Sequence, residues 1–240
     1  MFGIPKSIGI LKNINKFVKS DKKFNKRYKV IITPPNTLIQ NFVKLFKKQK
    51  ISLGAQNCYH KDLYSSDTGA ISPYMLKSIG SEYIIIGHSD NRSEGDDDLM
   101  LKAKVQHALN NKMKIIFCIG ENKIQKKKRQ TFKTLQKQIT NSIDKKFKKT
   151  DIIVAYEPIW SIGTGKIPNS KELLQTTIFI KKVLKNIFKS KNTPAVLYGG
   201  SVDSSNISQF RNINEIDGFL IGGASKSDKK FIDIIKNYYR

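Results

Sequence analysis

Short runs of aliphatic and aromatic residues alternate along the chain with longer segments in which apolar positions recur every three or four residues. The short runs predict seven buried strands. They lie at residues 30–32, from 51, and at 83–86, 115–119, 152–156, 195–198 and 219–221. The longer segments predict eight helices. These lie at residues 5–20, 38–46, 74–79, from 99, and at 131–147, 170–188, 204–210 and around 231–235.

This alternation predicts an α/β fold in which helices cover a parallel sheet. Every predicted strand is apolar, as in a sheet buried on both faces, and every connection is long enough for a helix. A closed (β/α)8 barrel is a form that fits a chain of this length in one domain. Such a ring needs a strand before its first helix, yet the pattern opens with the helix at residues 5–20. We therefore expect a single barrel domain over residues 1–240 without its first β-strand, with seven strands and eight helices.

The composition is that of a globular chain. Hydrophobic residues make up 39% of the 240 residues, and no apolar run approaches the ~20 residues of a membrane-spanning helix. Residues 1–17 lack the uninterrupted apolar core of a signal peptide, so we expect a cytoplasmic protein. Cys58 and Cys118 have neither disulfide-framework nor metal-ligand spacing, so we expect no metal site. The acids at residues 96–98 precede a predicted helix and are interpreted as its N-terminus.

The formal net charge of +25 raises two further classes of partner, nucleic acids and anionic membranes. However, the lysines are spread over nearly every predicted helix, and the densest basic run, residues 126–129, has no interleaved aromatic residues. Solvated helix surfaces explain this distribution better, so we expect no nucleic acid and no membrane as partners. The positive field would still speed the arrival of an anionic substrate.

Residues with candidate chemistry cluster where predicted strands end, and in a parallel sheet these ends share one rim. His88 follows the strand at residues 83–86, and Glu157 follows the strand at 152–156. Glu157 is held by Pro158, and the glycine-containing segment up to Lys166 comes directly after. This order predicts an aimed carboxylate base followed by a mobile lid. Taken singly, Glu157 could be a strand cap and His88 a structural histidine.

Glycine-rich stretches follow the last two predicted strands, as YGGS (198–201) and IGGAS (221–225). Backbone N–H groups in such loops can hold a phosphate dianion. We therefore predict that Gly163, Ser201, Gly222 and Gly223 bind a phosphate, although each stretch alone could be a turn. With Glu157 removing a proton and His88 donating a hydrogen bond, this rim would enolise the carbon beside a carbonyl group.

Seven motifs along the chain are similar to those of the triosephosphate isomerase family. They are GAQN (54–57), TGAISPYML (68–76), IIIGHSDNR (84–92), CIGE (118–121), AYEPIWSIGTGK (155–166), LYGGSV (197–202) and GFLIGGAS (218–225). The resemblance implies a TIM barrel that interconverts dihydroxyacetone phosphate and D-glyceraldehyde 3-phosphate, a step of glycolysis and gluconeogenesis, without a cofactor. It also implies an enediolate intermediate.

The resemblance assigns roles residue by residue. Glu157 matches the family's base, and His88 matches its electrophile. Gly163, Ser201, Gly222 and Gly223 match its phosphate binders, and residues 158–166 match its closing lid. The loop around Thr68 matches the segment that docks beside a partner subunit's site, which implies a homodimer.

Three departures from the family pattern bear on these expectations. The family's first strand ends in Asn-Trp-Lys-Met, and the Asn and Lys lie outside this sequence, which starts at Met1. Loss of one electrostatic stabiliser lowers a rate by about 10²- to 10³-fold, so we expect reduced activity of the chain as written. Our hypothesis is that Met1 is an internal methionine of the natural protein. Asp90 replaces a glutamate that in the family pairs with the first-strand lysine, and Ala70 replaces a glutamate of the dimer loop.

Three other interpretations stay open at this point. The chain could be a truncated relative with little or no activity. It could be a basic anion- or nucleic-acid-binding protein on a barrel scaffold, for which binding would fall steeply with salt. It could also be another phosphate-binding barrel, although such a protein has no reason to carry both GHS and YEPIW.

Overall fold

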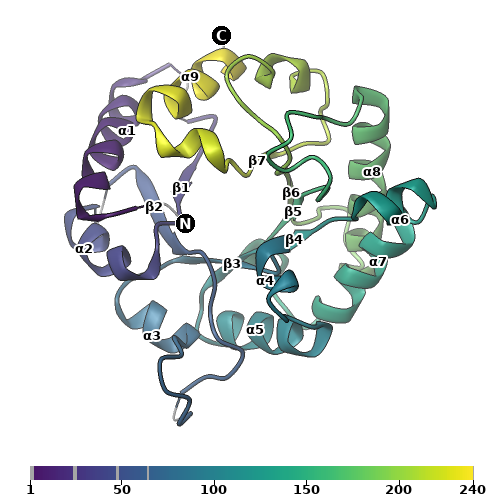
Figure 1. Cartoon of the computed structure of the whole chain (residues 1–240), viewed down its shortest axis with the longest axis horizontal. Coiled ribbons are helices and arrows are strands. Elements are labelled where there is room, and N and C mark those ends of the chain that lie inside the picture. Colours follow the sequence, from purple (N-terminus) through teal and green to yellow (C-terminus); the bar gives the residue numbers. More distant parts are fainter. Residues whose placement is uncertain (1–2, 24–25, 47–48, 64, 240) are drawn as a thin grey trace.

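The computed structural model describes residues 3–23, 26–46, 49–63 and 65–239, so the expectation for Met1 falls outside the described residues. Seven parallel strands form one sheet in the order of the sequence. They are β1 (Val30–Ile32), β2 (Ile51–Ala55), β3 (Tyr83–Ile86), β4 (Lys114–Ile119), β5 (Ile152–Tyr156), β6 (Ala195–Tyr198) and β7 (Gly218–Phe219). Figure 1 shows the strands curled around a central axis with the helices outside them. Among the described residues no strand precedes α1 (Ile8–Ser20), so this is the predicted (β/α)8 arrangement without its first strand.

Helices follow the strands in alternation, as the sequence predicts. The predicted helices correspond to η1 (Pro5–Ser7) with α1 (Ile8–Ser20), α2 (Asn36–Phe46), α3 (Pro73–Ser78), α5 (Asp98–Asn110), α7 (Thr131–Ser142), α8 (Ser170–Phe188), η3 (Ile207–Phe210) and α9 (Asp228–Tyr239). Two short helices that were not predicted, α4 (Ser89–Ser93) and α6 (Lys123–Lys127), follow β3 and β4. Two further single turns are η2 (Lys149–Asp151) and η4 (Gly223–Lys226).

Several predicted elements have different bounds in the structure, and the ends of α7 and β7 are two examples. The helix expected at residues 131–147 ends at Ser142, because Ile143 is extended and the Asp144 side chain accepts a hydrogen bond from the Lys146 N–H at 2.9 Å. Such a local side-chain bond competes with the helix. The last strand is Gly218–Phe219, so it begins one residue before the predicted run at 219–221 and ends two residues before the end of that run.

The acids at residues 96–98 form a helix start, as predicted. The Asp97 carboxylate accepts a hydrogen bond from the Met100 N–H at 2.8 Å and caps α5. Asp96 lies 2.6 Å from the buried Lys104 ammonium. Asp97 therefore caps α5, Asp98 lies in its first turn, and Asp96 pairs with a lysine of the same helix.

Alternate residues of the central strands face the two sides of the sheet. Ile84 and Ile86 of β3 belong to the core between sheet and helices, whereas Tyr83 and Ile85 belong to a second cluster inside the barrel. Burial on both faces explains why these strands are continuous apolar runs. No helix in the described ranges is long and apolar enough to span a membrane.

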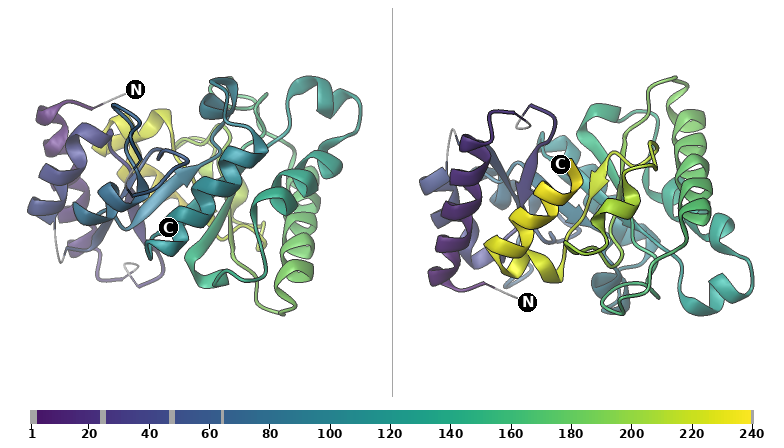
Figure 2. Two further views of the ribbon diagram at one scale, coloured as in Figure 1. Left: turned by 90° about the horizontal axis from the view of Figure 1, so that it is seen from below. Right: turned by 90° about the horizontal axis from the view of Figure 1, so that it is seen from above.

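The described residues show no pairing between β7 and β1, yet the ring of helices continues across this position. Helices α1 and α9 lie side by side in all the views (Figures 1 and 2). The Asn13 amide nitrogen lies 2.5 Å from the Asp228 carboxylate and joins the two helices. Helices α1 and α9 therefore cover the outside of the sheet where its two edge strands, β1 and β7, face each other.

Candidate active site

Glu157 follows β5, and its position is set by two neighbouring glycines. Its N–H donates to the Ile119 carbonyl at 2.7 Å, and the residue is only 5% exposed. A Cβ atom at Gly199 would lie 2.6 Å from Glu157 Cγ, and one at Gly120 would lie 1.9 Å from the Glu157 carbonyl oxygen. Only glycine at these two positions lets the ends of β4 and β6 come this close to Glu157. Gly199 consequently lies against the Glu157 side chain, and Gly120 lies against its backbone carbonyl.

The surroundings of Glu157 favour its protonated form. Burial raises the pKa of the carboxyl group, and the nearby Asp90 charge adds to this, whereas His88, a hydrogen bond with Cys118 and the charge of Arg92 lower it. In the described part of the chain, Glu157 Oε2 is buried without a hydrogen-bond partner. A buried carboxylate oxygen without a partner is costly and is a mark of a functional group.

His88 follows β3 and lies at the start of α4. Its Nδ1 accepts a hydrogen bond from the Asp90 N–H at 3.2 Å, which leaves the proton of the neutral imidazole on Nε2. That Nε2 lies 3.6 Å from Glu157 Oε1. The Asp90 carboxylate is 3.4 Å from Nδ1 but is 86% exposed, so water screens it. His88 and Glu157 thus face each other at the rim where the parallel strands end.

Residues 158–166, which we call the lid, contact the ends of two strands. The Trp160 indole N–H donates to Glu121 Oε1 at 2.8 Å, beyond the end of β4. On the side of β6, the Ser201 hydroxyl donates to the Ser161 carbonyl at 2.6 Å and accepts from the Gly165 N–H at 3.1 Å. Glu121 is fully buried, and burial raises the pKa of its carboxyl group. The lid is therefore tied to the same rim as Glu157.

The predicted phosphate binders differ in their surroundings. Ser201 is occupied by the lid, since its N–H also lies 3.3 Å from Ser161 Oγ. A Cβ atom at Gly163, Gly222 or Gly223 would meet nothing within 4 Å. Gly163 has φ +67, which favours glycine, but packing within the chain does not require glycine at the other two positions. We call Gly163, Gly222 and Gly223 the glycine cradle, and it faces open space.

The structure brings the two catalytic candidates together and places the glycine loops at the same rim. Strands β6 and β7 are parallel neighbours, with Leu197 paired to Gly218 and Tyr198 to Phe219. The loops that follow them, which carry Ser201 and Gly222, therefore leave the sheet on the side of Glu157. Among the described residues, no group of three or more His, Cys, Asp or Glu side chains is placed to hold a metal ion.

Two supporting side chains escaped the sequence analysis. The Gln138 amide on α7 bonds both backbone groups of Gly120, at 2.9 Å to its N–H and 3.1 Å to its carbonyl. Lys126 on α6 lies 3.6 Å from the centre of the Trp160 ring. Polar residues on helices give no local signal for such contacts. Glu121, by contrast, was visible as an acid at a strand end.

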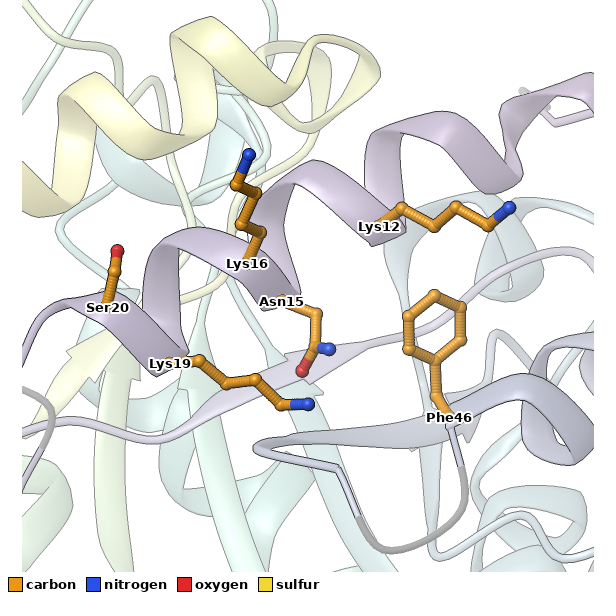
Figure 3. A pocket seen from close by; sticks show the side chains of 6 residues that line it. All are labelled: Lys12, Asn15, Lys16, Lys19, Ser20 and Phe46. Atoms are coloured by element: carbon orange, nitrogen blue, oxygen red, sulfur yellow. The ribbon is translucent and has the colours of Figure 1, made fainter.

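A hollow of about 450 Å³ lies away from this rim. It is lined by Lys12, Asn15, Lys16, Lys19, Ser20 and Phe46 (Figure 3). These residues come from the C-terminal part of α1 and the end of α2, which lead into the beginnings of β1 and β2. The hollow is therefore at the opposite end of the barrel from Glu157.

Comparison with known proteins gives one consistent result. The family model "Triosephosphate isomerase" matches residues 5–238. A triosephosphate isomerase of Thermodesulfovibrio yellowstonii is 35% identical over 227 residues, with 93% of this chain and 91% of the relative covered. The Saccharomyces cerevisiae triosephosphate isomerase is 36% identical over 211 residues, covering 87% and 84%.

A solved structure supports the same conclusion. The crystal structure of triosephosphate isomerase from Bartonella henselae matches with a TM-score of 0.89 at 30% identity. The match covers 100% of this chain and 96% of that one. With its parallel strands, its facing carboxylate and imidazole and these matches, the chain belongs to the triosephosphate isomerase family.

Proposed function

We propose that this protein interconverts dihydroxyacetone phosphate and D-glyceraldehyde 3-phosphate by moving a proton between neighbouring carbons. Family membership supports the reaction, and the observation that carries the mechanism is the buried Glu157 with Oε1 3.6 Å from His88 Nε2. We also propose that the reaction is a step of glycolysis and gluconeogenesis and that the protein is cytoplasmic.

The proposed roles follow from hydrogen-bonding capacity. Glu157 Oε2, which has no partner among the described residues, takes the proton from the carbon beside the carbonyl group. The Nε2–H of His88 donates to the carbonyl oxygen and stabilises the enediolate. Glu157 then returns the proton to the neighbouring carbon. Burial makes the carboxylate a stronger base than one in water, because it raises its pKa.

The glycine cradle and Ser201 are proposed to hold the phosphate group. Support comes from the open space in front of the three glycines, where a ligand oxygen can approach backbone N–H groups. Ser201, in the loop after β6, contacts the lid at Ser161 and Gly165. Bound phosphate and the ordered lid would thus stabilise each other.

We also propose a homodimer formed through the loop around Thr68. This loop extends from the barrel beside α3 (Figure 1). It is braced internally, since Asp67 lies 3.0 Å from the Lys61 ammonium and 3.0 Å from the Tyr59 hydroxyl. Leu63 and Tyr74 beside it are 44% and 45% exposed. Sedimentation at several protein concentrations tests this proposal, and a monomer at all of them would contradict it.

The alternative class, an anion- or nucleic-acid-binding protein, would need basic side chains directed at one ligand. The lysines around the hollow on α1 do not converge, because Lys16 points toward α9 whereas Lys12 and Lys19 point away from it (Figure 3). They fit a solvated helix face. The isomerase function therefore remains the conclusion.

A coupled assay with glyceraldehyde 3-phosphate tests the proposed function. We expect turnover by the wild-type chain and a loss of about 10²- to 10⁴-fold in kcat for Glu157→Gln, because the amide cannot accept the proton. Glu94→Gln, an exposed acid beyond α4, is the matched control and should retain wild-type activity. Equal activity of both variants would contradict the assignment.

A further inference from the structure

The indole of Trp160 in the lid is held on two sides. Its N–H donates to Glu121 Oε1 at 2.8 Å, and the Lys126 ammonium lies 3.6 Å from the ring centre. An ammonium over an indole face is a favourable cation–π contact. Trp160 is the only tryptophan of the chain, so its fluorescence reports this environment alone.

Lys126 is itself directed by a residue beyond the lid. Its ammonium lies 2.5 Å from Glu172 Oε1 in the first turn of α8, the helix that follows the lid. The two side chains are 31% and 39% exposed, and an exposed ion pair contributes little to stability. What the ion pair does is fix the direction of the ammonium. One side chain of α6 thereby contacts both the lid and the helix after it.

The other partner of the indole is fixed independently of Lys126. Glu121 is fully buried, and its oxygens also accept from the Tyr156 hydroxyl at 3.2 and 3.3 Å. Glu121 therefore belongs to the core of the barrel, whereas Lys126 reaches the indole from the surface. Lys126 can consequently be replaced without disturbing the core.

We propose that Lys126 is a positioning residue that holds Trp160, and with it the start of the lid, against the end of β4. Trp160 lies three residues after Glu157, so this contact keeps the carboxylate in its place beside His88. The lysine touches neither substrate nor the reacting atoms and acts through the indole. The inference rests on the proposed isomerase function, since the lid is there for that reaction.

Three variants test whether Lys126 positions Trp160 or only forms an exposed ion pair with Glu172 that has no effect on the lid. Lys126→Met removes the ammonium and keeps the length of the side chain. Lys126→Arg restores a cation that stacks on aromatic faces. Lys127→Met is the matched control, because Lys127 is exposed on the same helix. Each variant is measured for acrylamide quenching of Trp160 fluorescence, for kcat and KM, and for its melting temperature.

We expect Lys126→Met to fold and to expose Trp160 more strongly to acrylamide. Its kcat/KM should fall about tenfold, equivalent to about 1.4 kcal/mol of transition-state stabilisation, with both kcat and KM changed because the competent lid is less populated. Lys126→Arg should recover most of the loss in both measurements. Lys127→Met should match the wild type.

The inference is overturned if quenching and kcat/KM of Lys126→Met equal those of Lys127→Met. It is also overturned if only one of the two measurements changes, since the effect on the reaction would then not pass through Trp160. Absence of activity in the wild type would instead refute the proposed function. In that case quenching alone decides whether the contact holds the lid, and unchanged quenching in Lys126→Met rejects it.

Discussion

Glu157 and the glycine cradle lie in opposite kinds of surroundings at one rim of the barrel. Glu157 is 5% exposed, with Gly199 against its side chain and Gly120 against its backbone carbonyl, whereas added Cβ atoms at the glycines of the cradle would meet nothing within 4 Å. The proposed acid–base pair, Glu157 and His88, is thus positioned by contacts within the chain. The glycine cradle, our proposed phosphate site, faces open space.

This difference indicates how the two parts respond to substitution. A change near Glu157 should disturb both chemistry and folding, because the neighbours are in contact. A change in the cradle should disturb ligand affinity alone. The following predictions test this division, from the largest effect to the smallest.

Among the substitutions of residues around Glu157 and in the cradle, the largest effect is expected for His88→Ala, which removes the hydrogen-bond donor opposite Glu157. Loss of one such stabiliser lowers kcat by about 10²- to 10³-fold. Inhibition by inorganic phosphate should remain as in the wild type, because the cradle is intact. Glu94→Gln, the exposed acid beyond α4, serves as the control with unchanged kinetics. A weakened phosphate affinity in His88→Ala would show that the two parts are not separate.

Gly199→Ala should affect catalysis and stability together. The new Cβ would lie 2.6 Å from Glu157 Cγ and would displace the carboxylate. A misplacement of this kind can lower kcat by about 10²-fold, and overpacking costs about 1–3 kcal/mol of stability. Steady-state kinetics and urea unfolding measure the two effects. Wild-type kcat in this variant would mean that the position of Glu157 is not fixed by Gly199.

Gly223→Ala is the counterpart in the cradle. Its Cβ meets no atom of the chain, so the free energy of unfolding should stay within about 0.5 kcal/mol of the wild type. The inhibition constant of phosphate should rise about tenfold, which corresponds to about 1.4 kcal/mol. Unchanged phosphate inhibition would remove Gly223 from the proposed binding site.

The smallest effect concerns stability and pH. Burial raises the pKa of Glu157 in the folded protein, so its contribution to stability is fully present below the unfolded pKa and is lost as pH rises through the folded pKa. At pH 7, Glu157→Gln should therefore melt a few degrees higher than the wild type. Near pH 4, around the ordinary pKa of a glutamate, the difference should vanish. A variant that melts lower than the wild type at pH 7 would contradict the burial argument.

Most of the fold was predictable from periodicity because the strands are buried on both faces. The runs at residues 83–86, 152–156 and 195–198 and the helix at 170–188 have the predicted bounds. The short helices α4 and α6 were missed, since five-residue helices carry no apolar period. The end of α7 was missed because a local bond of Asp144 overrides an apolar pattern that continues to Phe147.

Only those site residues that directly follow a predicted strand could be placed from the sequence. His88 and Glu157 could be placed at one rim because both directly follow a strand. The support that Gln138 gives to Gly120 and that Lys126 gives to Trp160 depends on helix orientation, which the sequence pattern does not specify. The engagement of Ser201 with the lid likewise depends on the conformation of residues 158–166.

The central claim is that Glu157 moves the substrate proton, and deuterium exchange tests it most directly. Dihydroxyacetone phosphate is incubated with the protein in D₂O, and its carbon-bound hydrogens are followed by NMR. We predict that the wild type introduces deuterium at the carbon beside the carbonyl group. Glu157→Gln, which keeps the phosphate site, should introduce none at comparable times. Exchange by Glu157→Gln at the wild-type rate would contradict the claim.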